Sequence, residues 1–101
     1  MTDHQITKVV GANVRKARLH ANLTQECLAE LIGIEWKSIS NLENGRNSLL
    51  LPKIARIIQA LGVSPNALFD GLPEPDRKAM EKIKKALVRK RKPKGEKGAG
   101  N

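Results

Sequence analysis

The sequence predicts an all-α fold in which short helices, joined by brief loops, form one compact domain. Apolar residues recur at helical spacing along successive stretches, and Asn, Gly and Pro stand between those stretches at positions that begin or end helices. The 101 residues include one Phe, one Trp and no Tyr, so the core must be aliphatic, which favours a small helical bundle. This length leaves room for one domain and a tail.

A first helix is expected from about Gln5 to about His20. Its helical spacing is carried by Ile6, Val9, Val10, Asn13, Val14 and Ala17. Asn22 follows this helix, and Asn tolerates the left-handed conformation that ends helices.

Thr24 is a suitable N-cap for a second helix, although Cys27, three residues later, cannot complete a capping box. This helix is expected to bury Leu28, Ala29 and Ile32 and to end at Gly33.

A third helix is expected after Ile34, which anchors the turn, and extends to Leu42 or Glu43. At about 100° per residue, one side of it carries Ser38, Ile39 and Leu42, and the other carries Trp36, Lys37, Ser40 and Asn41. If Ile39 and Leu42 anchor the helix, it presents an indole, an ammonium, a hydroxyl and a carboxamide outward together. Such a row, held rigidly by a second helix, is what reading base edges in a DNA major groove requires.

Two shorter helices complete the domain. Asn44-Gly45 is a turn signal, and Pro52 suits the first turn of a fourth helix. The apolar stripe of that helix is predicted to be Leu51, Ile54, Ile58 and Leu61, with Gly62 at its end. Ser64-Pro65 begins a short fifth helix with Ala67, Leu68 and Phe69. The helix-turn-helix domain is thus expected to comprise residues 1–72.

Residues 73–92 are predicted to form a linker and a basic amphipathic sixth helix, with Met80, Ile83 and Leu87 along one side. Because a lone helix of this length is marginal in water, it should dock, pair with a partner helix, or fray. Residues 93–101 have no apolar face and are expected to be a disordered basic tail.

The formal net charge of +9 is distributed unevenly. Residues 1–73 hold eight Lys or Arg against six Asp or Glu, whereas residues 74–101 hold eleven against four. The basicity therefore belongs mostly to the tail. It supports non-specific attraction to polyanions and does not argue for sequence specificity.

Several function classes find no support in the sequence. No apolar run approaches a membrane span of ~18 residues, and the first residues lack the organisation of a signal peptide. Cys27 is the single cysteine, which rules out an internal disulfide, and His4 and His20 have no ligand companions. No nucleophile and base stand together, so we expect no enzyme, cofactor, metal or small-molecule ligand, and a cytoplasmic protein.

The residues resemble the Cro and repressor-type (XRE) helix-turn-helix family over residues 6 to 70, roughly two-thirds of the chain. The motifs that carry this resemblance are Leu23-Thr24-Gln25, Leu28-Ala29-Glu30, Gly33, Ser38-Ile39-Ser40, Leu42-Glu43-Asn44-Gly45, Ile54-Ala55 and Ala60-Leu61-Gly62-Val63-Ser64. Each is weak alone, and their joint order and spacing are specific. The resemblance implies a lambda-repressor-like five-helix domain.

The resemblance also implies residue roles. Arg18 on the first helix would pair with Glu43 as a structural ion pair, and Ala29 would be small because the second and third helices cross closely. Base reading would fall to Trp36, Lys37 and Asn41, since Lys suits guanine acceptors and Asn suits adenine. Phosphate binding, through backbone N–H groups, helix termini and charge, would fall to Gln25, Ser38, Ser40, Asn44, Gly45 and Arg46.

Three positions depart from the family pattern. Glu35 replaces the usual Ser or Thr cap of the recognition helix, and it either accepts a hydrogen bond from a cytosine amino group or faces solvent. Trp36 occupies a usually polar position, where it either contacts a thymine methyl or sugars, or packs back over Ile39. Leu31 is expected to expose apolar surface.

Other residues also have two interpretations. Lys37 and Asn41 either contact DNA or form a solvated face. Cys27 is either a redox-responsive thiol or, as we prefer in the absence of a second Cys, a small residue at a semi-exposed site. The basic tail is either solvated or in contact with DNA phosphates.

Two functions of different class follow. The first is a sequence-specific regulator of transcription, a homodimeric repressor that binds a palindromic double-stranded DNA operator. Its dimer surface would be either the fifth helix with Leu68, Phe69 and Leu72, or the Met80-Ile83-Leu87 stripe. The second is an antitoxin-like or coactivator-like adaptor that uses the same fold for protein–protein contacts.

Overall fold

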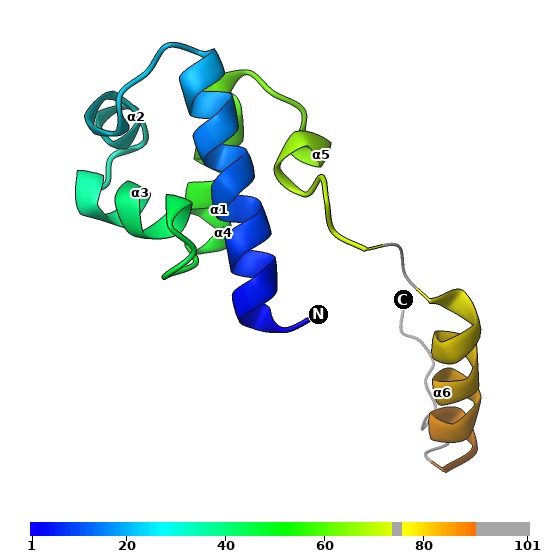
Figure 1. The fold of residues 1–101 in the computed structure, drawn as a ribbon. Coiled ribbons are helices and arrows are strands. Elements are labelled where there is room, and N and C mark those ends of the chain that lie inside the picture. Colours follow the sequence, from blue (N-terminus) through cyan, green and yellow to red (C-terminus); the bar gives the residue numbers. More distant parts are fainter. Residues whose placement is uncertain (74–75, 91–101) are drawn as a thin grey trace.

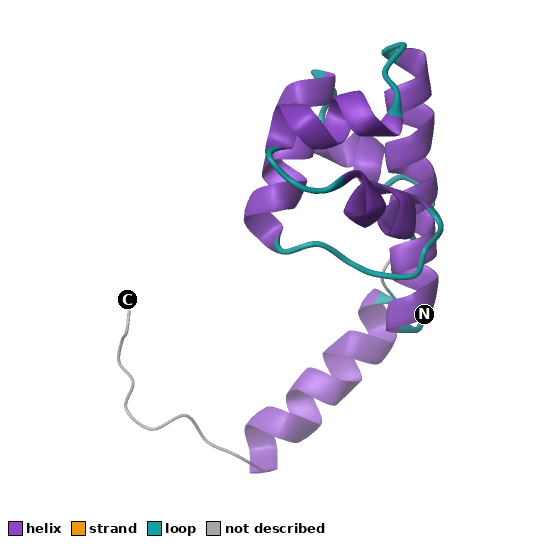
Figure 2. Cartoon of the chain, turned by 90° about the vertical axis from the view of Figure 1, so that its left-hand side faces the viewer, coloured by secondary structure: helices purple, strands orange, loops and turns teal. Residues whose placement is uncertain are grey.

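The computed structural model describes residues 1–73 and 76–90, and in these residues it contains six helices and no strand (Figure 2). The helices are α1 (Asp3–His20), α2 (Gln25–Ile32), α3 (Trp36–Glu43), α4 (Leu51–Leu61), α5 (Pro65–Leu68) and α6 (Arg77–Lys90). The predicted all-α fold is confirmed. The expected disordered tail over residues 93–101 lies outside the described residues.

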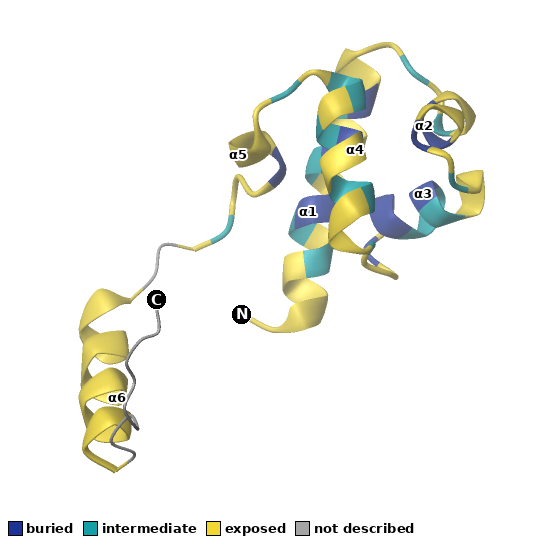
Figure 3. Ribbon diagram, turned by 180° about the vertical axis from the view of Figure 1, so that it is seen from behind, coloured by how far each residue is buried: buried dark blue, intermediate teal, exposed yellow. Residues whose placement is uncertain are grey.

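The first five helices pack around α1 (Figure 1). This long helix contacts α3, α4 and α5, while α2 packs on α3 and α4. As a result α2 and α3 lie on one side of α1 and α5 lies on the other (Figure 1). Helix α6 stands apart from this group, and none of its residues is buried (Figure 3).

The core is aliphatic, as the composition predicted. Its buried apolar residues come from all five packed helices: Val10, Val14, Leu28, Ala29, Ile32, Ile39, Leu42, Ile57 and Leu68. Ile34, in the turn between α2 and α3, packs against this cluster. Ala29 is buried between α2 and its neighbours, consistent with the close crossing that the family resemblance implies.

Capping and turn residues decide where α2 begins and ends and where the chain turns after α1. Thr24 accepts a hydrogen bond from the N–H of Cys27 at 3.0 Å, so it is the N-cap predicted for α2. Gly33 closes α2 in the left-handed conformation with φ = 77°, and Asn22 adopts φ = 61° in the turn before it. Both positions agree with the turn signals in the sequence.

Helix α1 begins earlier than the predicted Gln5 because a capping box precedes it. The Thr2 hydroxyl accepts from the N–H of Gln5 at 3.2 Å, and the Gln5 side chain accepts from the N–H of Thr2 at 2.8 Å. The Thr-x-x-Gln spacing is the sequence signal for this start.

The predicted apolar stripe of α4 is wrong at one position. Leu51 is 79% exposed, and Ile57 is the fully buried residue of this helix. Ile54, Ile58 and Leu61 are half-buried and pack on the core. Leu51 is the first residue of α4, before the helix meets the rest of the domain. Helix α5 ends at Leu68, so Phe69, expected inside it, is instead its exposed C-cap residue.

Two hydrogen bonds from one side chain hold the end of α5 against α1. The Asn13 amide donates to the carbonyl oxygens of Leu68 at 2.8 Å and Asp70 at 2.7 Å. Asn13 thus occupies an inward position of α1 without being apolar. Leu68, fully buried here, cannot belong to a dimer surface, which removes it from the first of the two surfaces considered above.

Candidate nucleic-acid interface

The two faces of α3 differ sharply in burial. Ile39 and Leu42 are fully buried against the core, whereas Trp36 is 49% exposed and Lys37 is exposed (Figure 3). Asn41 is half-buried, so it lies at the margin of the outward face rather than at its centre.

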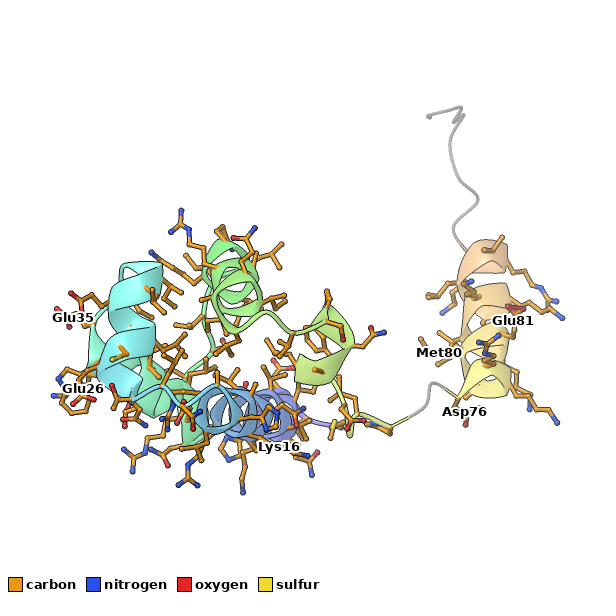
Figure 4. The ribbon with its side chains drawn as sticks, turned by 90° about the horizontal axis from the view of Figure 1, so that it is seen from above. Lys16, Glu26, Glu35, Asp76, Met80 and Glu81 are labelled. Carbon is orange, nitrogen blue, oxygen red and sulfur yellow. The ribbon has the colours of Figure 1, made fainter. Side chains whose placement is uncertain are left out.

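Helix α3 begins without a side-chain cap. Glu35 is its N-cap residue and makes no capping hydrogen bond. Glu35 is exposed at the edge of the molecule, as Figure 4 shows. The position of this eight-residue helix is consequently set at its other end and along its buried face.

The C-terminal end of α3 is held by the buried pair of Arg18 and Glu43. The Arg18 Nε donates to Glu43 Oε2 at 2.6 Å and a terminal guanidinium nitrogen donates to Oε1 at 2.9 Å. The other terminal nitrogen donates to the carbonyl of Leu23 at 2.7 Å. One guanidinium thus links α1, the turn before α2, and α3. The hydrogen bond to Glu43 raises the pKa of Arg18 above its ordinary value, against the opposing effect of burial.

Gln25 belongs to the same network, which the sequence did not reveal. Its amide nitrogen donates to Glu43 Oε1 at 3.1 Å. Of its two amide hydrogens one is therefore engaged inside the protein, and the half-buried side chain joins α2 to the end of α3. The predicted phosphate-binding residue thus also has a structural contact.

A close backbone approach further fixes α3 against α1. A Cβ built on Gly11 would lie 2.0 Å from the carbonyl oxygen of Leu42, closer than any real Cβ contact. Gly11 therefore permits α1 and the end of α3 to cross at this distance. The only sequence signal for this crossing is a glycine inside an otherwise helical pattern.

The loop after α3 uses its own N–H groups to end the helix. Those of Asn44, Gly45 and Arg46 donate to the carbonyls of Ser40 at 3.1 Å, Leu42 at 3.0 Å and Asn41 at 2.9 Å. The Asn44 amide also donates to the Ser40 carbonyl at 2.9 Å. These backbone groups are already satisfied, so the expectation that they hold phosphates is not supported by the geometry. The guanidinium of Arg46, which is exposed, is the free donor of this loop.

Three predicted phosphate-binding residues share a polar hollow. Ser38, Gly45 and Arg46 line it together with Asp3, His4 and Thr7 from the first turns of α1. Gly45, with φ = 72°, is buried there next to Lys8. The sequence did not predict that the start of α1 reaches this hollow, because no local signal links residue 3 to residue 45.

The N-terminus of α2 offers a second set of donors. Thr24 satisfies the N–H groups of Cys27 and Leu28 through its hydroxyl and carbonyl. The N–H groups of Gln25 and Glu26, the first two of the helix, have no intrahelical acceptor because of their position.

Residues 1–73 and 76–90 contain no group of three or more His, Cys, Asp or Glu arranged to hold a metal ion. Within the same residues, no helix combines the length and the apolar character needed to cross a bilayer.

Comparisons with known proteins also identify a helix-turn-helix domain. The sequence model of the family described as helix-turn-helix domain matches residues 11–72. The chain is 37% identical over 68 residues to the control protein C.BamHI of Bacillus amyloliquefaciens, covering 66% of this chain and 84% of that protein. It is 31% identical over 65 residues to y4aM of Sinorhizobium fredii, an uncharacterized HTH-type transcriptional regulator. That alignment covers 64% of this chain and 46% of the relative, so the chain spans less than half of that protein's length.

A solved structure gives the same result. The restriction-modification controller protein C.AhdI from Aeromonas hydrophila superposes with a TM-score of 0.60 at 30% sequence identity. The match covers 62% of this chain and 96% of that one. The shared part is thus the packed helices rather than the whole chain.

Proposed function

Because the chain belongs to the helix-turn-helix family of Cro and repressor-type (XRE) transcriptional regulators, we propose that it represses transcription as a dimer with α3 in the major groove. The target is a palindromic double-stranded DNA operator that the dimer occludes. Its two recognition helices enter successive major-groove faces ~34 Å apart. The proposed place of action is the cytoplasm, and the chemistry is binding rather than catalysis.

One observation carries this proposal: α3 exposes Trp36 and Lys37 while its opposite face is locked into the core. A rigid helix with free polar and aromatic groups is what reading base edges requires. In the proposed complex Lys37 donates to guanine acceptors, and Asn41 pairs with adenine. Trp36 contacts a thymine methyl or sugars.

Phosphate contacts orient this helix in the proposal. The exposed guanidinium of Arg46 and the free N–H groups at the start of α2 supply charge and donors. The side chains of Gln25, Ser38, Ser40 and Asn44 complete the proposed phosphate-facing set, which does not include Gly45 because its N–H donates to the Leu42 carbonyl. In this division of the chain, residues 1–72 form the DNA-binding domain, residues 73–92 carry the linker and basic helix, and residues 93–101 form the tail.

Selection of bound duplexes from a random pool tests the proposal. The expected result is one preferred half-site in inverted repeat, with a protein-to-duplex ratio of two. The Asn41→Ala variant should lose preference at a single operator position, with a cost of about 1–3 kcal/mol for the cognate base. No enrichment of any sequence at physiological ionic strength would refute sequence-specific binding.

The emission of Trp36, the single tryptophan, gives a direct second readout. Cognate duplex should shift or quench it if the indole lies in the groove, and a scrambled duplex of equal length serves as the control. Unchanged emission on saturation with cognate duplex would remove Trp36 from the proposed interface.

A second candidate function, the protein–protein adaptor, is favoured by one observation. Leu31 is 62% exposed on α2 and Trp36 is 49% exposed on α3, so apolar surface faces outward on both helices. An adaptor would show no discrimination among oligonucleotides in the selection experiment. The two functions therefore predict opposite outcomes of the same assay.

A further inference from the structure

Helix α6 carries an apolar face that no part of residues 1–73 and 76–90 covers. Met80, Ile83 and Leu87 are each about half exposed, and the helix has no buried residue. At about 100° per residue these three lie on one side of the helix, and Lys84 and Lys90 flank them on the two edges. We call this surface the α6 face.

A helix of this kind is not stable by itself. It has 14 residues, a length at which an isolated helix is marginal in water, and its apolar face gains free energy only when it is covered. The α6 face therefore requires an occupant. The question is which surface of matching shape and charge is available.

Helix α2 offers such a surface on its outer side. Leu23, Cys27 and Leu31 follow one another at spacings of four residues and line a shallow hollow together with Glu30. Leu31 and Cys27 are exposed there. Glu26 adjoins the stripe one turn before Glu30, and both carboxylates are exposed. We call this surface the acidic α2 face.

The two faces have opposite charge. No Lys or Arg occurs between Arg18 and Lys37, a stretch that contains Glu26, Glu30 and Glu35. Helix α6 holds seven Lys or Arg and one acidic residue, Glu81. Figure 4 shows Glu26 and Glu35 together at one edge of the molecule. Cationic flanks around one apolar stripe thus match anionic flanks beside the other.

The stripes also match in length. Leu23, which precedes the N-cap of α2, extends the Cys27–Leu31 pair at its N-terminal end, and Met80 to Leu87 spans roughly 10 Å at the helical rise. Three apolar side chains can therefore meet three along a helix–helix contact. The chain's other apolar hollows lack this charge match: one between α1, α4 and α5 places Lys16 opposite Asp70.

We propose that α6 of one copy docks on the acidic α2 face of a second copy. A reciprocal exchange of two such helices closes a two-fold dimer, because each copy then offers one α6 and one α2. The proposal deepens the dimer that forms part of the proposed function, but it concerns the protein without DNA.

The geometry favours a second copy over the same chain. Glu26 lies at the edge of the molecule farthest from α6 (Figure 4). The connection from Leu68 to Arg77 spans at most about 30 Å when fully extended. To reach its own α2, that connection would have to pass around the packed helices. A neighbouring copy can present its α2 without such a detour.

A charge-swap experiment tests the contact. Sedimentation equilibrium of the full chain without DNA should show a dimer for the wild type. Dimerisation should weaken on the order of tenfold or more in Glu26→Lys/Glu30→Lys and in Lys84→Glu/Lys90→Glu. An equimolar mixture of these two variants, each carrying one reversed face, should form heterodimers, because in both contacts of the mixed dimer α6 then meets an α2 face of opposite charge.

The matched control reverses two charges on the far side of α6. Lys78→Glu/Lys85→Glu changes the net charge of the chain by the same amount but leaves the flanks of the α6 face intact. Its dimerisation should equal that of the wild type. Equal weakening by both α6 variants would mean that net charge alone controls association, and the proposal would be wrong. Far-UV circular dichroism shows whether each variant keeps its helices.

A cross-link distinguishes a second copy from the same chain and does not depend on charge reversal. Because Cys27 is the single cysteine, Met80→Cys should form a disulfide between copies on mild oxidation. Met80→Cys combined with Cys27→Ser, and Leu50→Cys at a highly exposed site elsewhere, serve as controls and should cross-link on the order of tenfold more slowly.

Each outcome of the cross-link decides the proposal. Covalent dimers specific to Met80→Cys with Cys27 present support exchange between copies. A monomeric product with no free thiol means that α6 docks on its own chain, and rates equal to the controls mean that the faces do not meet. Both of these results overturn the proposal, while sequence-specific DNA binding in the selection assay remains a separate result.

Discussion

Replacing Arg18 by Met is expected to remove most of the domain's free energy of unfolding. The guanidinium donates to both oxygens of the Glu43 carboxylate and to the Leu23 carbonyl. The side chains of Arg18 and Glu43 are 8% and 1% exposed. In Arg18→Met the carboxylate of Glu43 stays buried with the Gln25 amide as its remaining partner.

The magnitude follows from that stranded charge. Breaking a buried ion pair by removing one partner costs about 3–5 kcal/mol, since the other charge keeps its desolvation penalty. The stability of a domain of this size is on the order of 5 kcal/mol or somewhat more. Arg18→Met should therefore be partly unfolded at room temperature. In Arg18→Met/Glu43→Leu no charge is left buried, so the double variant should regain at least about half of the loss.

Urea denaturation followed by far-UV circular dichroism measures both variants and Glu43→Leu, which completes the double-mutant cycle. Because the pKa of Arg18 is raised in the folded state, its contribution is present at every pH below the ordinary Arg pKa and is lost only as the pH rises through the raised value. The cost should thus be equal at about pH 6 and about pH 8. A loss below about 1 kcal/mol in Arg18→Met would refute the reasoning, since surface ion pairs have that value.

Three further results are expected. Gly11→Ala should destabilise the domain by about 1–3 kcal/mol in the same denaturation assay, because the new Cβ meets the Leu42 carbonyl. In Gly33→Ala the new Cβ would have no neighbour within 4 Å, and only the left-handed φ of 77° is unfavourable for alanine. This substitution should lower the free energy of unfolding by about 1 kcal/mol. The reverse order would contradict the crossing described for α1 and α3. Arg46→Ala should weaken binding to all duplexes alike and lower the salt slope by about one unit, whereas Arg56→Ala on α4 should leave both unchanged; a change in preferred bases would count against a phosphate contact. Removing residues 91–101, which hold four Lys or Arg and one Glu, should lower affinity for non-cognate DNA and flatten its salt dependence while the selected operator stays the same.

Signals within a few residues of one another predicted local structure well. Thr24, Gly33 and Asn22 act where their capping and turn preferences place them, since such preferences depend on backbone geometry alone. The Thr2–Gln5 capping box is a local signal of the same kind, and it sets the start of α1. Helix starts and ends are in this sense properties of the local sequence.

Contacts between distant residues were harder to predict. In α4, neighbouring isoleucines satisfy helical spacing in more than one register, and only the position of α4 against the core selects Ile57. In the sequence Gly11 is only a residue of low helix propensity, and its role becomes clear from the Leu42 carbonyl that packs against it. The pairing of Arg18 with Glu43 was expected only from the family resemblance, because 25 residues separate the two.

The same difference between local signals and distant contacts applies to the candidate site. The amphipathic pattern of α3 predicted that Trp36 and Lys37 face outward, and both are exposed. Spacing could not show that Gln25 is bound to Glu43. Nor could it show that the N–H groups of Asn44, Gly45 and Arg46 are used within the chain, because that depends on how the backbone turns after α3.

The absence of a side-chain cap at the start of α3 has a consequence for the evolution of such a protein. Everything that holds this helix acts from its inner face and its far end, through Ile39, Leu42 and Glu43. Lys37, on the exposed face, takes no part in holding the helix. If α3 reads DNA as proposed, substitutions at Trp36 and Lys37 can exchange one target sequence for another while Ile39, Leu42 and Glu43 keep the helix in place.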